Sequence, residues 1–355
     1  MASVHKFDFL IVGLGIAGAT LTHRLMLSGK KVCVIDNGKA ETSSRIAAGL
    51  INPVTGRNYV RSWMIDDLLD EATRYYADFE SEFGVEAAIR LDILRVLKDD
   101  LEEERWMMRT GDPEYARFMG DVRHGGVVRE IFREDSNYGV VHEGMRISFP
   151  VILDTIRDAL VQNGCYLEGQ FDHSALVKDP EGYRYGDIAA QEVIFSEGAG
   201  MRRNPFVNAL PMSDNKGEIL VLRSDKYPTD LMVKRKHFTI PLENGTIWFG
   251  SANSWKDTSE EPSEKAFQIL KEDLENHYRM AFEIVRQRAA FRPTVKDRRP
   301  LLGTHPKYPG MHLFNGFGTK GASLAPYFSK VMMQYLLHDG KLPGEVDIRR
   351  FDLPD

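Results

Sequence analysis

A glycine-rich turn near the N-terminus limits what this chain can fold into more than any other feature. Residues 6–36 show the pattern of a buried strand, the turn GLGIAG, an apolar-striped helix and a second strand that ends at Asp36. Gly13, Gly15 and Gly18 permit a tight turn, close approach of a pyrophosphate and packing of the helix on the strand, while an acid such as Asp36 accepts ribose hydroxyls. The sequence therefore predicts a βαβ unit that binds a dinucleotide, although the acid alone does not separate NAD from FAD.

Length, composition and charge favour a globular protein of two domains. The chain has 355 residues, 43% hydrophobic and 28% charged, and no run of about 18 apolar residues, so no transmembrane segment is expected. Asp8 interrupts the first apolar run, so we predict no secretory signal and a cytoplasmic location. The net charge of −6 argues against a nucleic-acid partner, because a negative protein repels phosphate groups. Cys33 and Cys165 lack disulfide or zinc-site spacing, and no metal site is expected.

Pieces of an α/β pattern return along the rest of the chain. An irregular segment at 40–62 follows the βαβ unit, and alternating strand and helix patterns resume after Pro150. Residues 216–255 are strand-like, with a hairpin turn at Asn244-Gly245. Helices are expected over 65–83, 151–164, 263–289 and 321–338. This order predicts a cofactor domain that is interrupted by inserted strands.

A second glycine-rich loop, GFGTKGASLAP, lies at residues 316–326 and has the pattern of a turn that opens a helix. Glycine lets the backbone approach a ligand closely, and a helix start presents free N–H groups and a partial positive charge. Two such loops, one near each end of the chain, indicate a long ligand that is held at both ends.

Five segments in order resemble the flavin-dependent family of D-amino acid oxidase, glycine oxidase and monomeric sarcosine oxidase. After the N-terminal fingerprint they are SSRIAAGLINP at 43–53, EVIFSEGAG at 192–200, HFTIPLENGTIWFG at 237–250, RPTVKDRRPLLG at 292–303 and the C-terminal glycine loop. The resemblance implies a Rossmann-like FAD-binding domain of the α/β class, interrupted by a substrate domain built on a mostly antiparallel sheet. It places the FAD-binding domain at 1–80, 146–212 and 288–355, and the substrate-binding domain at 81–145 and 213–287.

The same resemblance assigns a set of residues to FAD. They are Gly13, Gly15, Ile16, Ala17, Gly18, Asp36, Asn37, Ser43, Ser44, Arg45, Ala48, Gly49, Leu50, Ile51, Gly198, Ala199, Gly316, Gly318, Thr319, Lys320 and Gly321. In the family, the last loop meets the pyrimidine edge of the flavin, where helix-start N–H groups stabilise the charge of the reduced ring. Some relatives attach FAD through a C-terminal cysteine or an N-terminal histidine. This chain has no cysteine near its C-terminus and no histidine within 41–62, so the resemblance implies noncovalent FAD.

The resemblance also implies residues for the substrate. Arg292 aligns with the arginine that grips the substrate carboxylate in glycine oxidase, and a planar guanidinium suits a bidentate carboxylate clamp. The alternative is an arginine held in a loop salt bridge to Asp297. Phe238 stands where glycine oxidase has a tyrosine, and the neighbouring His237 is either a polar replacement or an exposed residue at a strand edge. Asn253 follows the hairpin in the region that borders the family's pocket.

One lysine role stays open at the level of sequence. A lysine above flavin N5 assists the reaction with oxygen in some members of the family. Lys216, Lys234 and Lys320 are candidates for that position, and a site without such a lysine is an equally open alternative. Reduction of the flavin by substrate is therefore a firmer expectation than its reoxidation by oxygen.

The sequence favours an FAD enzyme that oxidises the C–N bond of an amino acid or a carboxylate-bearing secondary amine. Hydride transfer to flavin N5 would leave an imine for water to hydrolyse, and O2 or another acceptor would reoxidise the flavin. A first alternative is oxidation of carboxymethylaminomethyl uridine in tRNA, because the loop GFGTKG also resembles the oxidase half of a bifunctional tRNA-modifying enzyme. Further alternatives are a flavoprotein that passes electrons to a partner and an NAD-dependent dehydrogenase.

Overall fold

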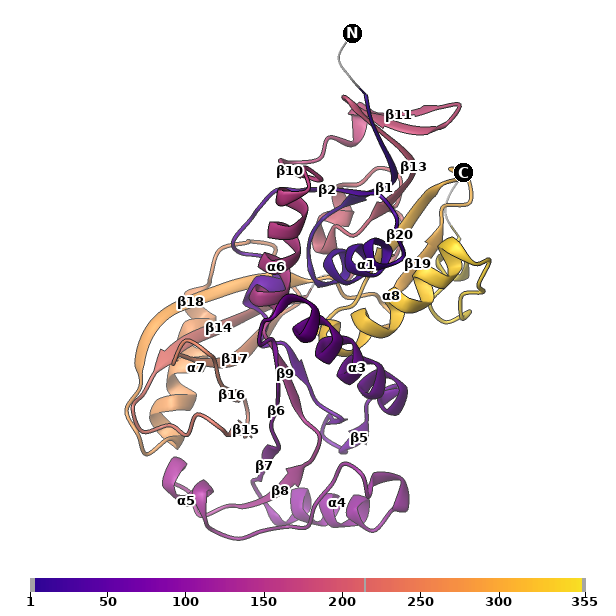
Figure 1. Ribbon diagram of the computed structural model, residues 1–355. Coiled ribbons are helices and arrows are strands. Elements are labelled where there is room, and N and C mark those ends of the chain that lie inside the picture. The colour runs from indigo at the N-terminus through magenta and orange to yellow at the C-terminus, as the bar shows by residue number, and fades with distance from the viewer. Residues whose placement is uncertain (1–3, 214, 353–355) are drawn as a thin grey trace.

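The computed structural model describes residues 4–213 and 215–352, and two large sheets dominate it (Figure 1). The first sheet has eight strands, in the order β10-β2-β1-β13-β12-β11, with β20 beside β13 and β19 beside β20. Its parallel centre joins β10, β2, β1, β13 and β20, whereas β11, β12 and β19 run antiparallel to their neighbours. The strand bounds are Tyr166–Glu168 (β10), Val32–Asp36 (β2), His5–Val12 (β1), Ile188–Phe195 (β13), Gly182–Tyr185 (β12), Leu176–Asp179 (β11), Met311–Asn315 (β20) and Leu301–Thr304 (β19).

The central strands of this sheet are apolar on both faces, as expected for parallel strands that are covered on both sides. In β1, Phe9 and Ile11 belong to one core cluster, and Leu10 and Val12 belong to another on the opposite face. Alternate residues of a strand point to opposite faces, so this near-continuous apolar run fills two cores at once.

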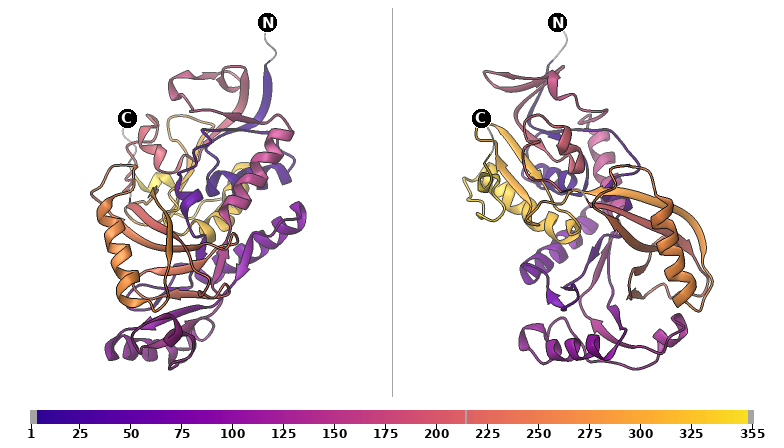
Figure 2. Two further views of the ribbon diagram at one scale, coloured as in Figure 1. Left: turned by 90° about the vertical axis from the view of Figure 1, so that its left-hand side faces the viewer. Right: turned by 180° about the vertical axis from the view of Figure 1, so that it is seen from behind.

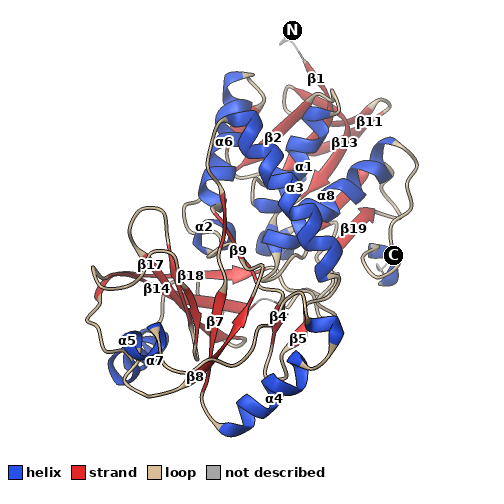
Figure 3. Cartoon of the chain, turned by 60° about the horizontal axis from the view of Figure 1, so that its bottom comes forward, coloured by secondary structure: helices blue, strands red, loops and turns tan. Residues whose placement is uncertain are grey.

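Four helices gather over one side of the first sheet (Figure 3). They are α1 (Ile16–Leu27), α3 (Ile65–Phe83), α6 (Phe149–Gln162) and α8 (Gly321–Leu337), and α8 packs against both α1 and α3. Arg24 of α1 links the three, because its guanidinium donates to Glu71 of α3 at 2.7 Å and to Ser329 of α8 at 2.9 Å. The helix that follows the first glycine turn is thereby held against the helix that follows the last one.

The second sheet has seven strands in the order β18-β14-β17-β16-β15-β7-β8, and all pairs except β15 with β7 are antiparallel. Helix α7 (Glu264–His277) packs on β14 and β17, and α4 (Asp100–Thr110) and α5 (Val127–Ile131) lie at the end farthest from β11 (Figures 1 and 2). The strands are Glu283–Arg292 (β18), Asn215–Arg223 (β14), Ile247–Ser254 (β17), Phe238–Pro241 (β16), Met232–Lys234 (β15), Ile93–Leu97 (β7) and Asn137–Val141 (β8).

Short elements connect the two sheets. A three-stranded sheet has the order β3-β9-β6, and a ribbon joins β4 and β5. Helix α2 follows β2 and lies close to β18 and α6. The bounds are Ser43–Ile46 (α2), Leu50–Ile51 (β3), Val54–Thr55 (β4), Val60–Arg61 (β5), Ala88–Arg90 (β6) and Met145–Ile147 (β9), and short 3-10 turns cover Pro113–Tyr115, His173–Ala175, Gly198–Arg203 and Ile348–Arg350.

The predicted α/β class and the mostly antiparallel second sheet are confirmed, but the helix expected over 263–289 is wrong in its second half. Helix α7 ends at His277, and β18 then runs from Glu283 to Arg292 along β14. The helix ends where Tyr278 takes an extended backbone conformation. This conformation lets the buried Tyr278 ring pack on Phe132, with 4.6 Å between the ring centres. The domain boundaries drawn from the sequence stay a prediction. Within residues 4–213 and 215–352, no helix has both the length and the apolar character to cross a bilayer.

Candidate active site

One large cavity, of about 1930 Å³, is lined by residues of both large sheets and by the loops between them. It brings together most of the site residues predicted from the sequence. On the cofactor side these are Gly13, Gly15, Ile16, Ala17, Asp36, Asn37, Ser43, Ser44, Arg45, Ala48, Gly49, Leu50, Gly198, Ala199, Gly318, Thr319, Lys320 and Gly321, and on the substrate side His237, Phe238 and Arg292. Three predicted residues, Gly18, Ile51 and Gly316, are not part of the cavity wall.

The glycines of the first turn are required by close backbone packing. Gly13 has a φ of +98°, and a Cβ there would lie 2.6 Å from the carbonyl oxygen of Ser196. A Cβ on Gly18 would lie 2.0 Å from the Gly13 carbonyl oxygen, so this glycine packs the helix on the turn rather than facing the cavity. The Ile16 amide donates to Ser44 Oγ at 3.0 Å and ties the turn to the segment 43–53.

The acid at the end of β2 is fixed in place by two backbone amides. Leu14 N–H donates to Asp36 Oδ2 at 2.7 Å, and Gly38 N–H donates to Asp36 Oδ1 at 2.9 Å. Each carboxylate oxygen keeps a further lone pair for a ligand. This arrangement suits a ribose with two hydroxyls, which is the role predicted for Asp36.

The segment that follows α2 is held between the two sheets. A Cβ on Gly49, where φ is +67°, would lie 1.8 Å from the Ile147 carbonyl oxygen, so only glycine fits beside β9. The indole N–H of Trp248 in β17 donates to the Ile46 carbonyl oxygen at 2.8 Å. Arg45, in contrast, forms an ion pair with Asp154 at 2.7 Å, so its charge is already neutralised.

The C-terminal glycine loop meets the N-terminal fingerprint directly. Gly316 and Gly318 have φ values of +81° and +55°, and Gly318 N–H donates to the Pro293 carbonyl oxygen at 3.0 Å. A Cβ on Gly321, the first residue of α8, would lie 3.0 Å from Ile16 Cγ2. The two glycine loops therefore line the same cavity from adjacent positions, which is the geometry that a long ligand held at both ends requires.

Comparison with known proteins identifies that ligand. A profile of FAD-dependent oxidoreductases matches residues 8–335. The chain belongs to the FAD-dependent oxidoreductase family. FAD is thus its cofactor, and the cradle fits the group, because the glycine positions leave no room for side chains and Asp36 is set to accept ribose hydroxyls.

Individual proteins resemble this chain in fold or in sequence, each at low sequence identity. Glycine oxidase from Geobacillus kaustophilus superposes with a TM-score of 0.77 at 19% identity, over 95% of this chain and 96% of that one. Iminodiacetate oxidase from Chelativorans sp. BNC1 superposes with a TM-score of 0.75 at 20% identity, over 95% of this chain and 97% of that one. The tRNA 5-methylaminomethyl-2-thiouridine biosynthesis bifunctional protein MnmC of Caulobacter vibrioides is 23% identical over 97% of this chain and 58% of its own length.

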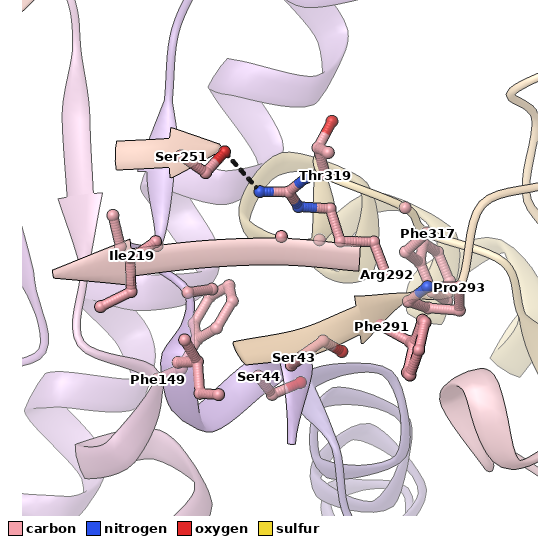
Figure 4. A pocket seen from close by; sticks show the side chains of 18 of the residues that line it. Ser43, Ser44, Phe149, Ile219, Ser251, Phe291, Arg292, Pro293, Phe317 and Thr319 are labelled. Carbon is pink, nitrogen blue, oxygen red and sulfur yellow. Dashed lines mark hydrogen bonds between the residues drawn. The ribbon is translucent and has the colours of Figure 1, made fainter. Parts of the chain in front are cut away.

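At the position predicted for the substrate, the Arg292 guanidinium is held only by neutral oxygen atoms among the described residues. It donates to Asn215 Oδ1 at 2.7 Å, to Asn253 Oδ1 at 2.5 Å and to Ser251 Oγ at 2.7 Å, and Figure 4 shows it directed toward Ser251. Among residues 4–213 and 215–352 it forms no ion pair, and burial lowers its pKa to about 10. The salt bridge to Asp297 considered above is not formed, since Asp297 pairs with Arg350 at 2.8 Å.

A glycine makes room for this guanidinium. Gly217 lies in β14 beside β18, and a Cβ there would lie 2.3 Å from Arg292 Nη2. Gly217, Asn215 and Ser251 were not predicted from the sequence, because they reach Arg292 only through the pairing of three strands that are distant in the chain. Asn253, which was expected to border the pocket, is one of the three acceptors.

His237 and Phe238 differ in what they offer to the cavity. The imidazole Nδ1 of His237 lies 3.0 Å from Asp273 Oδ2, and the ring packs edge-on against Phe249. His237 is therefore buried in a side-chain pair, not exposed at a strand edge. The Phe238 ring lies in the cavity wall, with Lys234 Nζ 4.4 Å from its centre.

The three candidate lysines have different surroundings. Lys216 is fully buried, donates to Asp257 at 2.7 Å and lies 3.6 Å from Glu218, so it is neutralised by carboxylates. Burial and then the charges of Arg299 and Arg298 lower the pKa of Lys320, the residue directly before α8. Burial and then Arg95 and Lys98 lower the pKa of Lys234 to about 7. Lys320 and Lys234 line the cavity, and Lys216 does not.

Proposed function

We propose that this FAD-dependent oxidoreductase oxidises the C–N bond of an amino acid or of a secondary amine that bears a carboxylate. The observation that supports this most is Arg292. Its partly buried guanidinium lines the cofactor cavity and is bonded only to neutral oxygens among the described residues. A cation that is largely removed from water without a counter-charge is costly, and a substrate carboxylate would supply that counter-charge through two parallel N–H···O bonds.

The chemistry follows from what the chain places around the substrate. FAD, when bound, supplies the acceptor for two electrons and a hydrogen from the carbon next to nitrogen. Arg292 fixes the carboxylate and thereby orients the amine, while the apolar wall that includes Phe238 and Ile219 excludes water. A desolvated pocket also favours the neutral amine, which is the form that can be oxidised. The imine product is then hydrolysed by water.

We infer that FAD is held without a covalent bond and that O2 or another electron acceptor reoxidises it. The predicted set of cofactor residues, Lys320 included, is proposed to hold FAD. The division into an FAD-binding and a substrate-binding domain is likewise proposed, with the two large sheets as its physical basis.

Anaerobic reduction by a panel of amines tests the proposal. The purified holoprotein would be mixed with glycine, sarcosine, D-alanine and iminodiacetate, and the visible flavin band would be followed while products are identified by NMR. We expect bleaching by at least one of these amines, with the carbonyl product of imine hydrolysis. Admission of air would then reveal hydrogen peroxide if O2 is the acceptor. Bleaching by none of the carboxylate-bearing amines would contradict the proposal.

Oxidation of a modified uridine in tRNA is the second candidate, because MnmC matches this chain over 97% of its residues. A carboxymethylaminomethyl group also presents a carboxylate next to a C–N bond, so Arg292 would serve in the same way. The test is anaerobic bleaching by tRNA that carries the modified base, with unmodified tRNA as the control. Faster bleaching by modified tRNA than by any free amine would favour this candidate over the first.

A further inference from the structure

A buried tyrosine in the cavity wall has a hydroxyl group without an acceptor. Tyr59 is 2% exposed, and its Oη donates no hydrogen bond to any described residue; burial raises the pKa of this phenol, and the adjacent Arg95 side chain opposes that rise. The residue lines the same cavity as Arg292 but belongs to the segment between β4 and β5, not to any part of the flavin-binding pattern. A buried hydroxyl without a partner costs free energy, so a ligand atom is the natural acceptor for it.

Arg95 lies over this tyrosine and also has unused donors. Its Cζ is 5.6 Å from the centre of the Tyr59 ring, and its Nε is buried without a partner in the described part of the chain. One terminal nitrogen donates to the Arg235 carbonyl oxygen at 3.2 Å, and the other is 3.9 Å from Glu102 Oε1. The same oxygen, Glu102 Oε1, also lies 3.7 Å from Lys98 Nζ. One carboxylate therefore balances only part of the combined charge of Arg95 and Lys98.

Lys234 completes the cluster from the neighbouring strand. Lys234 in β15 is the register partner of Arg95 in β7, so the two side chains leave the same face of the sheet. Its ammonium group donates to the Lys236 carbonyl oxygen at 2.7 Å and, among described residues, forms no ion pair. Burial, Arg95 and Lys98 lower the pKa of Lys234, and the opposing effect of Asp273 on this pKa is smaller than each of them. The cavity wall therefore carries a concentration of positive charge with free donors.

The cluster of Tyr59, Arg95 and Lys234 lies several strands away from Arg292 in the second sheet. Arg292 reaches Ser251 in β17, whereas Lys234 lies two strands away in β15 and Arg95 three strands away in β7. Strands lie about 4.8 Å apart, so roughly 10 Å of sheet separates Ser251 from the strand of Lys234. One carboxylate group cannot bond Arg292 and the cluster at the same time. Phe238, in the strand between them, offers an apolar surface for the connecting part of a ligand.

We propose that Tyr59, Arg95 and Lys234 form a second anion subsite, so that the substrate amine carries a second acidic group besides the carboxylate at Arg292. This inference rests on the proposed function, because it takes Arg292 as the site of the first carboxylate. The second acid would lie against Lys234 Nζ and the Arg95 guanidinium, and the buried Tyr59 Oη and Arg95 Nε would donate to it once these side chains turn toward the ligand. The substrate class is then a dianionic amine.

Binding of unreactive ethers to the holoprotein tests the subsite. Oxydiacetate, 3-(carboxymethoxy)propanoate and 4-(carboxymethoxy)butanoate replace the amine by oxygen and carry two carboxylates at increasing separation. Methoxyacetate, ethoxyacetate and propoxyacetate are the corresponding monoanions. Dissociation constants would be measured by calorimetry and by the perturbation of the flavin spectrum. We expect at least one dianion to bind tenfold or more tightly than its monoanion partner.

Substitutions test whether Tyr59, Arg95 and Lys234 cause the preference for dianions. Y59F, R95M and K234M should each reduce the preference for the dianion to less than threefold, whereas K271M, which removes an exposed lysine of α7, should retain it. Equal binding of all dianions and monoanions, or a preference that survives R95M and K234M, would overturn the subsite. If the monoanions still bind and R292M abolishes that binding, only the second subsite has failed. If no ether binds and no carboxylate-bearing amine bleaches the flavin, the proposed function has failed with it.

Discussion

Replacement of Arg292 by methionine should separate catalysis from stability. Methionine approximates the length of the arginine side chain but removes the charge and all five N–H donors. If Arg292 anchors the substrate carboxylate, the variant loses two charge-assisted hydrogen bonds, each worth about 1.5–3 kcal/mol. At about 1.36 kcal/mol per tenfold, kcat/KM for the best amine should fall roughly 10²- to 10⁴-fold.

Stability should change far less than activity. Burial that lowers the pKa of Arg292 from 12.5 to about 10 corresponds to a cost of roughly 3 kcal/mol for holding the charge in the folded protein. R292M removes that cost but also removes the bonds to Asn215, Asn253 and Ser251, each worth about 1 kcal/mol. The two effects oppose each other, so the free energy of unfolding should stay within about 2 kcal/mol of that of the parent.

Stopped-flow bleaching and denaturant unfolding of the same preparations measure both quantities. R292K keeps the charge but not the planar fork, so we expect an intermediate loss of activity. R286M removes an exposed arginine from the same strand and serves as the matched control. Activity of R292M within threefold of the parent would refute the reasoning, and so would a stability loss above about 4 kcal/mol with substrate binding intact.

D36N should weaken FAD binding about tenfold or more by titration of the apoprotein, because a charged acceptor is lost. G18A should also weaken it, since its Cβ would lie 2.0 Å from the Gly13 carbonyl oxygen, whereas G344A, with open space, should not. K320M should lower the flavin midpoint potential by roughly 30 mV, because a cation before α8 stabilises reduced flavin, and an unchanged potential would contradict this. The affinity for the dianion that binds most tightly should fall as pH rises through about 7, where Lys234 loses its proton, and K234M should flatten the profile.

The cofactor half of the site was accessible from sequence because its signals are local. Gly13, Gly15 and Asp36 follow a spacing that a single βαβ unit imposes, and the structure places them on one cavity wall. The C-terminal loop needed the family resemblance as well, since nothing local shows that Gly321 lies against Ile16.

The substrate half was only partly accessible, because it depends on strand pairing. The bonds of Arg292 to Asn215 and Ser251 require β18 and β17 to lie on either side of β14, and residues 278–289 were expected to be helical. Pairing with β14 overrides the local helical pattern there. Arg95 and Lys234 are register partners in the parallel pairing of β7 with β15, which no motif in the sequence indicates.

Anaerobic bleaching by an amine and by its decarboxylated counterpart tests the central claim most directly. Sarcosine and dimethylamine differ only in the carboxylate that Arg292 is proposed to hold, and iminodiacetate with sarcosine isolates the second acidic group. We predict that the visible band of the bound FAD is bleached by a carboxylate-bearing amine at least a hundredfold faster than by the matching amine without the carboxylate. Equal rates for such a pair, or no bleaching by any carboxylate-bearing amine, would contradict the account.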